Sequence, residues 1–334
     1  MKAARFDVYG EPDEVVQLVD IDDPGPPGAG QVRVRMLAAP INPADLLLIR
    51  GIYGERPVLP HIAGLEGVGR IEAVGTGVEG LAPGTLVLPV PPSNWQEVRL
   101  LGAAEVVPLP ADIDIEQAAM LKVNPPTAEL MLSELVDLHP GEWVVQNAAN
   151  SAVGHLVVQI ARSRGIHTLN LVRREAARGP LAELGADAVL VDDGAAESDE
   201  LIEAARTHTG GAPVRLGLDA VAGSATERMG ALVADGGTIA SYGVLSGQSC
   251  QLSPAHLIFR HVTLRGFWVS SWFQSADAAR VSDLFTRLAG RVAAGELAAP
   301  VTARYPLTEL GTAIAHAGQE ERGGKVLLRM ADPA

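Results

Sequence analysis

The feature that constrains this chain most is a series of apolar strands that alternate with helices between about residues 143 and 242. A short apolar strand at 143–147 leads through a tight turn into a helix at 149–164, whose apolar residues recur at helical spacing. A further helix is predicted at 180–184, and further strands are predicted at 167–172, 188–191, 216–221 and 237–242. This alternation predicts an α/β domain with a doubly wound parallel sheet, the Rossmann fold.

The rest of the chain has a different pattern. Before about residue 120, short alternating strands separated by Gly and Pro are predicted at 31–38, 67–75 and 84–88, as in a compact β-barrel. After residue 260, the sequence predicts a strand at 262–268, a helix at 276–294 and a terminal strand at 324–329. If the last strand returns to the barrel, the chain consists of a discontinuous domain, 1–120 and 264–334, around an inserted domain of alternating strands and helices, 121–263.

Composition excludes several classes of protein. The length of 334 residues fits two domains, and a net charge of −14 without a basic run argues against nucleic-acid binding. The apolar runs are too short for a membrane helix of about 20 residues, and the first residues lack the apolar core of a secretory signal. We therefore expect a cytoplasmic protein that does not bind membranes. Cys250 is the only cysteine, which excludes a disulfide framework and a zinc site built on several thiolates.

The turn after the first strand of the alternating region is where a dinucleotide-binding fingerprint belongs. Aligned on its last glycine, G-x-G-x-x-G becomes Ala149-Asn-Ser-Ala-Val-Gly154, with Ala149 and Ser151 replacing two glycines. Small residues still let backbone N–H groups and a helix N-terminus approach a pyrophosphate, and Ser151 adds a hydroxyl. An ordinary strand–helix turn with a polar helix cap explains the same residues.

The next strand, predicted at 167–172, is followed by Arg173 and Arg174. An NAD-binding site usually has an acid at this position for the ribose 2′-hydroxyl. Two guanidinium groups suit a 2′-phosphate, which an acid would repel. The pair favours NADPH over NADH, the alternative being a solvated basic loop. Glu175 follows directly and weakens the expected affinity for the phosphate.

Six segments carry a resemblance to a known family: 41–45 (INPAD), 51–54 (GIYG), 64–69 (GLEGVG), 124–128 (NPPTA), 146–154 (QNAANSAVG) and 266–268 (GFW). The chain resembles the zinc-independent medium-chain dehydrogenase/reductase superfamily, and most closely its 2-enoyl thioester reductases (trans-2-enoyl-CoA reductases, mitochondrial type) of fatty-acid metabolism, with quinone oxidoreductases as further relatives. The resemblance implies a GroES-like β-barrel catalytic domain and a Rossmann domain. The Asn-Ser form of the fingerprint is typical of the reductase subgroup.

The resemblance also indicates that no metal is used. Alcohol dehydrogenases of the superfamily bind a catalytic zinc through a Cys in the segment matching 41–45 and a His in the segment matching 64–66. Here Asn42 and Leu65 occur in those segments, so a catalytic zinc is not expected. Glu66, beside the position of the missing His, is expected to be a buried structural carboxylate.

The implied reaction is the NADPH-dependent reduction of the C=C bond of a 2-enoyl thioester of CoA or acyl-carrier protein. Hydride goes to the β-carbon, and Tyr53 gives a proton to the α-carbon. A phenol has an ordinary pKa near 10, so Tyr53 is protonated at neutral pH, although a packed ring with an exposed hydroxyl is the structural alternative. Two other functions stay open: an NADPH:quinone or small-enone oxidoreductase, and a non-catalytic nucleotide-binding protein.

The resemblance assigns cofactor contacts to residues of both domains. They are Asn124, Asn150, Ser151, Ala152, Val153, Arg173, Arg174, Tyr242, Gly243, Val244, Phe267, Trp268, Val269 and Lys325. Asn42 and Trp268 are expected to contact the substrate. Phe267 and Trp268 also suit a plain core, and Lys325 a surface charge. The family further implies a homodimer formed through the edge strand near 257–265.

Overall fold

The computed structural model describes residues 1–194, 198–319 and 323–330, and its chain divides into two compact units. Unit 1 contains Met1–Pro125 and Asp277–Ala334, and unit 2 contains Pro126–Ala276. The first boundary lies close to the expected 120/121. The second lies after the expected 263/264, because the strand that follows residue 262 pairs within the sheet of unit 2.

Unit 2 contains a six-stranded sheet in the order β11-β10-β9-β12-β13-β14, and every neighbouring pair is parallel. Its strands are β9 (Trp143–Gln146), β10 (His167–Val172), β11 (Ala188–Val191), β12 (Val214–Asp219), β13 (Thr238–Ser241) and β14 (Thr263–Gly266). In chain order this is 3-2-1-4-5-6, the strand order of the Rossmann fold. The predicted α/β class is confirmed.

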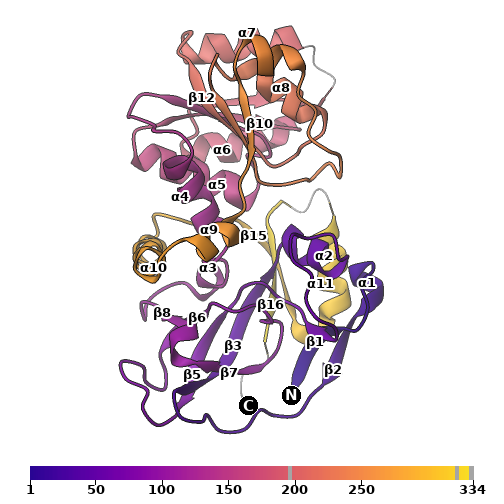
Figure 1. The fold of residues 1–334 in the computed structure, drawn as a ribbon, viewed down its shortest axis with the longest axis vertical. Helices are drawn as coiled ribbons and strands as arrows, with labels where there is room; N and C mark the ends of the chain where they lie inside the picture. The colour runs from indigo at the N-terminus through magenta and orange to yellow at the C-terminus, as the bar shows by residue number, and fades with distance from the viewer. Residues whose placement is uncertain (195–197, 320–322, 331–334) are drawn as a thin grey trace. The chain divides into compact units, whose positions relative to one another are not determined.

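The helices of unit 2 cover both faces of this sheet. They are α4 (Asn124–Glu134), which begins just before the unit boundary, α5 (Ala152–Ser163), α6 (Arg178–Leu184), α7 (Ser198–Thr209), α8 (Ser224–Leu232) and α9 (Val269–Ser275), with short turns at Glu175–Ala177 and Ala255–Phe259. Figure 1 shows α5 and α6 on one face and α7 and α8 on the other. Separate apolar cores lie on the two faces, one around Val158 and Leu181 and the other around Leu169 and Met229.

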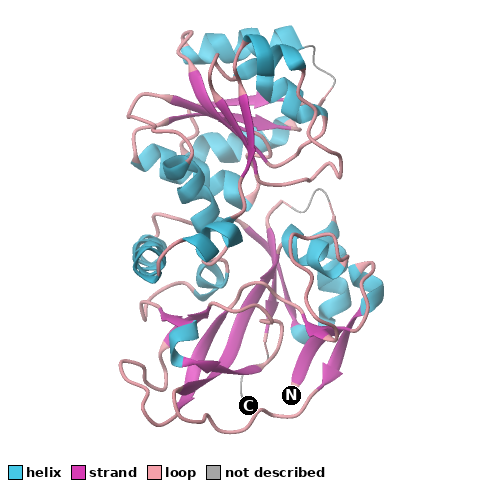
Figure 2. Ribbon diagram, viewed as in Figure 1, coloured by secondary structure: helices cyan, strands magenta, loops and turns pink. Residues whose placement is uncertain are grey.

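Unit 1 is built mainly of antiparallel strands, drawn in magenta in Figure 2. A seven-stranded sheet contains β3 (Gln31–Ile41), β5 (Val68–Val74), β6 (Leu86–Pro89), β7 (Val98–Gly102), β8 (Val106–Pro108), β15 (Val301–Pro306) and β16 (Lys325–Arg329). A second sheet contains β1 (Lys2–Phe6), β2 (Val16–Asp20) and β4 (His61–Ile62). The terminal strand β16 pairs with β3, Val326 opposite Ile41, so the end of the chain returns to the barrel as expected.

Helices complete unit 1. They are α1 (Pro12–Val15), α2 (Pro43–Ile49), α3 (Ile115–Ala119), α10 (Ala278–Ala293) and α11 (Leu310–Gly318), with 3₁₀ turns at Ala103–Glu105 and Leu307–Glu309. One apolar cluster contains Phe6, Met36 and Trp95 from the barrel together with Ile314 of α11. None of the helices within the described residues is long and apolar enough to cross a membrane.

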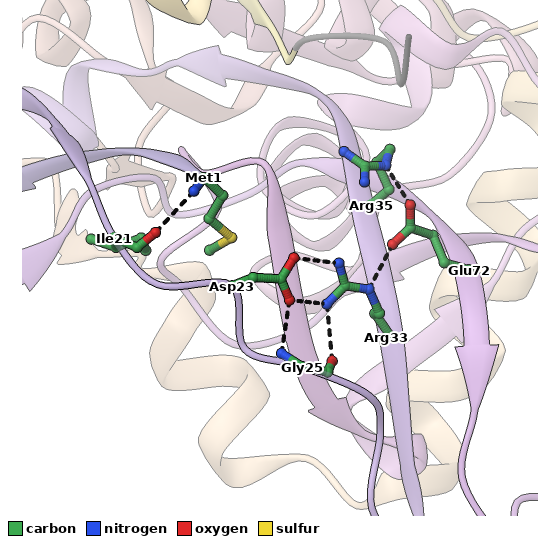
Figure 3. A network of polar contacts seen from close by, with 7 residues as sticks. All are labelled: Met1, Ile21, Asp23, Gly25, Arg33, Arg35 and Glu72. Atoms are coloured by element: carbon green, nitrogen blue, oxygen red, sulfur yellow. Dashed lines mark hydrogen bonds and ion pairs between the residues drawn. The ribbon is translucent and has the colours of Figure 1, made fainter.

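An ion-pair network fixes the outer loop of the barrel to β3 (Figure 3). Arg33 forms two hydrogen bonds with the Asp23 carboxylate, at 2.7 and 2.8 Å, and donates to the carbonyl of Gly25 at 2.9 Å. Glu72 on β5 accepts from Arg33 and from Arg35. The guanidinium of Arg33 therefore joins the 21–25 loop to two adjacent strands.

Candidate active site

The turn between β9 and α5 has the geometry of an anion-binding site. Ser151 is the N-cap of α5, and its Oγ accepts a hydrogen bond from the Gly154 N–H at 3.1 Å. A Cβ on Gly154 would lie 2.3 Å from the carbonyl oxygen of Ala149, so the turn and the helix approach each other closely. Ala152 and Val153 are the first two helical residues, whose N–H groups have no acceptor within an α-helix.

A tyrosine whose hydroxyl is buried, Tyr242, lies near this turn. The Tyr242 hydroxyl is inaccessible to solvent and makes no hydrogen bond of good geometry with the residues that the structure describes. Burial, reinforced by the charge of Asp219, raises the pKa of Tyr242 far above its ordinary value, and the neighbouring Ser151 hydroxyl offsets this only in part. An unsatisfied hydroxyl beside a helix N-terminus fits a polar ligand group, so the residues present suit a dinucleotide.

Sequence reasoning missed a buried network at the carboxyl ends of β9 and β12. The Asp219 carboxylate accepts from the Asn147 amide at 2.7 Å and from the Thr226 hydroxyl at 2.6 Å. It also accepts from the backbone N–H groups of Val221 and Ala222, both at 2.9 Å. These bonds fix the loop after β12, at the sheet edge where dinucleotides bind in this fold. The available signal was an acid, Asp219, inside the apolar strand predicted at 216–221.

Arg173 and Arg174 follow the end of β10, as expected, and both are exposed. Glu175, which weakened the prediction of a 2′-phosphate site, forms an ion pair with Arg178 at 3.0 Å. Arg178 therefore adds a third guanidinium to this loop and compensates the charge of Glu175. Arg178 was not among the residues predicted for the phosphate site.

Most of the remaining residues predicted for unit 2 lie just after β13 and β14. The Tyr242 N–H donates to the carbonyl of Asp219, the last residue of β12, at 2.9 Å. Val244, two residues later, is exposed. Phe267 donates its N–H to the Ser241 carbonyl at 2.9 Å. Trp268 is the N-cap of α9. Further predicted positions are placed as follows: Gly243 directly after Tyr242, Asn150 in the turn before α5, and Val269, buried, at the start of α9.

In unit 1, the structure brings together Asn42, Asn124 and Lys325 around Glu66. The Glu66 carboxylate accepts from the side-chain amides of Asn42 at 2.8 Å and of Asn124 at 3.4 Å. The Lys325 ammonium donates to the Asn42 side-chain oxygen. All four side chains are buried, so both ends of the Asn42 amide are bonded inside the protein. Lys325 is therefore not the surface charge that was its structural alternative.

Two further charged groups complete this buried cluster. Asp45 accepts from the backbone N–H groups of Asn42 and Leu65, both at 2.8 Å, and burial raises its pKa to about 6. Lys122 donates to the Leu65 carbonyl at 2.8 Å, and burial lowers its pKa to about 8. Burial also raises the pKa of Glu66 above its usual range, although the positive charge of Lys325 opposes the rise. The cluster thus combines two carboxyl groups with two amino groups.

Tyr53 lies in the loop that follows α2 and is half-buried, and its ring packs against the apolar core of unit 1. Helix α2 carries the loop and begins at Pro43, directly after its N-cap Asn42, whose backbone N–H donates to the Asp45 carboxylate. Among the residues that the structure describes, no cluster of three or more His, Cys, Asp and Glu could hold a metal ion.

Two family models match this chain. The model described as an alcohol dehydrogenase GroES-like domain matches residues 28–110, and the one described as a zinc-binding dehydrogenase matches residues 152–287. These matches and the observed sheets agree on a GroES-like barrel and a Rossmann sheet.

Curated relatives cover almost the whole chain. The enoyl-[acyl-carrier-protein] reductase, mitochondrial, of Bos taurus is 35% identical over 99% of this chain and 89% of its own length. The Arabidopsis thaliana protein of the same name is 38% identical over 89% of this chain and 79% of its own length. Both are named mitochondrial, so the expectation of a cytoplasmic protein is contradicted.

Solved structures give the same result. The Etr1p/NADP/crotonyl-CoA complex superposes with a TM-score of 0.87 at 26% identity, over 98% of this chain and 99% of the other. The mitochondrial 2-enoyl thioester reductase Etr1p/Etr2p heterodimer from Candida tropicalis gives a TM-score of 0.88 at 26% identity, with the same coverage. The chain therefore belongs to the medium-chain dehydrogenase/reductase superfamily of oxidoreductases, within its family of 2-enoyl thioester reductases.

Proposed function

We propose that this protein reduces the C=C bond of a 2-enoyl thioester, carried by CoA or acyl-carrier protein, with NADPH as the reductant. The observation that supports this most is the near full-length similarity to proteins named enoyl-[acyl-carrier-protein] reductase. A solved relative whose structure contains NADP and crotonyl-CoA supports the same cofactor and substrate class.

In this proposal, the first turn of α5 binds the pyrophosphate of the cofactor. The N–H groups of Ala152 and Val153 and the hydroxyls of Ser151 and Tyr242 supply the donors. Arg173 and Arg174 bind the 2′-phosphate, because guanidinium groups pair well with phosphate. The bound cofactor supplies the hydride that reaches the β-carbon.

Tyr53 is the proposed proton donor to the α-carbon. A phenol can give its proton to the enolate that forms after hydride addition. We also propose that Asn124 and Lys325 contact the cofactor and that Asn42 and Trp268 contact the substrate. For Asn42 the bonds to Glu66 and Lys325 support an additional role, which is to hold this buried cluster together.

We further propose a homodimer that forms through β14. This strand ends the sheet order of unit 2 and is largely exposed. The preceding turn exposes three large apolar side chains, Leu257, Ile258 and Phe259, the last of them 78% exposed. An exposed strand edge next to an apolar patch favours pairing with a second copy. In light scattering, the wild type should be dimeric and Phe259→Asp should shift toward the monomer.

The proposed activity is tested with a panel of acceptors. Purified protein should oxidise NADPH with crotonyl-CoA and form butyryl-CoA, whereas quinones and simple enones should be poor acceptors. Tyr53→Phe should lower kcat by well over tenfold and leave NADPH binding nearly unchanged. Tyr305→Phe is a matched control, because the Tyr305 hydroxyl hydrogen-bonds His316 at 2.9 Å and not the proposed site. Efficient turnover of quinones alone would support the alternative oxidoreductase instead.

A further inference from the structure

The loop that carries Tyr53 is held at both ends by one aromatic side chain. Tyr9 donates its hydroxyl to the Pro57 carbonyl at 2.6 Å, beyond Tyr53 in the chain. Before Tyr53, Gly51 has a φ of +73°, and a Cβ there would lie 2.9 Å from the Tyr9 ring. The Tyr9 side chain therefore lies close to Gly51 before Tyr53 and bonds to Pro57 after it.

Arg56 closes the same loop from within. Its Nε donates to the Gly51 carbonyl at 2.6 Å, across the turn that contains Tyr53. Its guanidinium carbon lies 5.5 Å from the centre of the Tyr9 ring, within the range of a cation–π contact. Tyr9 and Arg56 thus contact each other and the two ends of the loop, and we call this pair the Tyr9–Arg56 clasp.

The clasp is attached to the rigid part of unit 1. The Tyr9 ring packs against Phe6, which is fully buried in the core, with 6.4 Å between ring centres. Gly10 donates its N–H to the carbonyl of Ile49, the last residue of α2, at 3.2 Å. The next residue, Glu11, pairs with Arg50, with a closest N–O distance of 2.8 Å. Tyr9 is therefore positioned by both the barrel core and α2.

Apolar burial holds the loop itself only weakly. The side chain next to Tyr53, Ile52, is 65% exposed, and Val58 is 87% exposed. A loop with so little buried apolar surface needs directional contacts to keep one conformation. Within this loop, the hydrogen bonds to Gly51 and Pro57 supply such contacts.

We propose that the Tyr9–Arg56 clasp positions Tyr53 for proton transfer, with Arg56 and Tyr9 acting as positioning residues. The inference rests on the proposed function, in which Tyr53 donates the proton. Proton transfer requires the donor within hydrogen-bond reach of the carbon, and a displacement of about 1 Å can cost up to 10²-fold in rate. Loosening the loop therefore slows protonation without removing the phenol.

The first test compares single variants with a matched control. Arg56→Gln and Tyr9→Phe should each lower kcat for crotonyl-CoA reduction by about 5- to 50-fold and leave the Kd for NADPH unchanged. The solvent deuterium isotope effect on kcat should rise, because proton transfer becomes slower relative to the other steps. Arg56→Lys keeps one donor and should recover part of the rate. Arg70→Gln is the control, because Arg70 makes the same kind of bond, to the Gly84 carbonyl at 2.9 Å, in a different loop.

The second test asks whether Arg56 acts through Tyr53. Arg56→Gln should cause no further loss when Tyr53 is already Phe, since the group that it positions is then gone. An equal loss in both backgrounds, or no loss in the single variant, would overturn the clasp. A wild-type protein that reduces no enoyl thioester would instead overturn the proposed function. Full activity of Tyr53→Phe would remove Tyr53 from the mechanism and the clasp with it.

Discussion

Asn42 donates its side-chain N–H to the Glu66 carboxylate over 2.8 Å, and both side chains are almost completely buried. In the alcohol dehydrogenases of this superfamily, the matching segments supply zinc ligands. Here they supply an amide and a carboxylate, which are joined to the amino group of Lys325. The site is thus held by hydrogen bonds between buried side chains.

Replacing Glu66 by Gln tests the importance of this arrangement. Glu66 accepts hydrogen bonds from Asn42, Asn124 and the Val123 N–H, and an amide has one acceptor oxygen fewer. A buried donor left without an acceptor costs about 1–3 kcal/mol, so the free energy of unfolding should fall by that amount. Urea unfolding measures it, with exposed Glu79→Gln as the control for charge. A loss equal to that of the control would show that Glu66 does not hold the cluster.

Asp45 should make the stability depend on pH. Burial raises its pKa from 3.8 to about 6, so the folded state binds the proton more tightly than the unfolded state between these values. The stability contributed by the neutral acid is therefore lost as the pH rises from about 4 to about 6. The unfolding free energy of the wild type minus that of Asp45→Asn should therefore fall as the pH rises across this window and stay constant above it. Asp112→Asn, at an exposed position, is the control. A wild-type stability that rises with pH relative to Asp45→Asn would contradict the raised pKa of Asp45.

Gly154→Ala should weaken cofactor binding. The added methyl group would lie 2.3 Å from the Ala149 carbonyl, so the turn must open and the N–H groups at the start of α5 must move. We expect the Kd for NADPH to rise by more than tenfold, on the order of 1.4 kcal/mol or more. Gly290→Ala on α10 is a matched control, because its Cβ would meet no atom within 4 Å. Unchanged NADPH binding in Gly154→Ala would place the pyrophosphate elsewhere.

The double variant Arg173→Ala/Arg174→Ala tests the cofactor preference. If these groups bind the 2′-phosphate, KM should rise at least tenfold for NADPH and hardly change for NADH, which lacks that phosphate. Glu175→Gln should act in the opposite direction, since it removes a negative charge from the same loop. Arg206→Gln on α7 is the control for a surface charge. Equal changes with both cofactors would remove the two arginines from the phosphate site.

Much of the fold could be predicted because its signals are local. The strand at 143–147, the helix after it and the strand at 167–172 were predicted within three residues of β9, α5 and β10, since alternation and helical spacing depend on neighbouring residues. Unit 2 extends to Ala276, beyond the boundary expected at 263/264, and it includes the edge strand β14. Its place in the parallel sheet comes from pairing with β13, a contact between distant residues.

The candidate site was less predictable than the fold. Ser151 and Gly154 were found because a strand–turn–helix fingerprint is continuous in sequence. Lys122 and Asp45 were missed because both bond to the backbone of Leu65, which is distant from them in the chain and which only the fold brings near. The resemblance identified Asn42 and Lys325, but not that they bond each other across 283 positions of the chain.

The most direct test of the proposed reaction follows the two hydrogen atoms that are added to crotonyl-CoA. NADPH deuterated at C4 of the nicotinamide should place deuterium on the β-carbon of the product. Unlabelled NADPH in D₂O should place it on the α-carbon, and Tyr53→Phe should slow the formation of this product by well over tenfold. Absence of butyryl-CoA while NADPH is oxidised by quinones, or deuterium from the cofactor on the α-carbon, would contradict the proposed function.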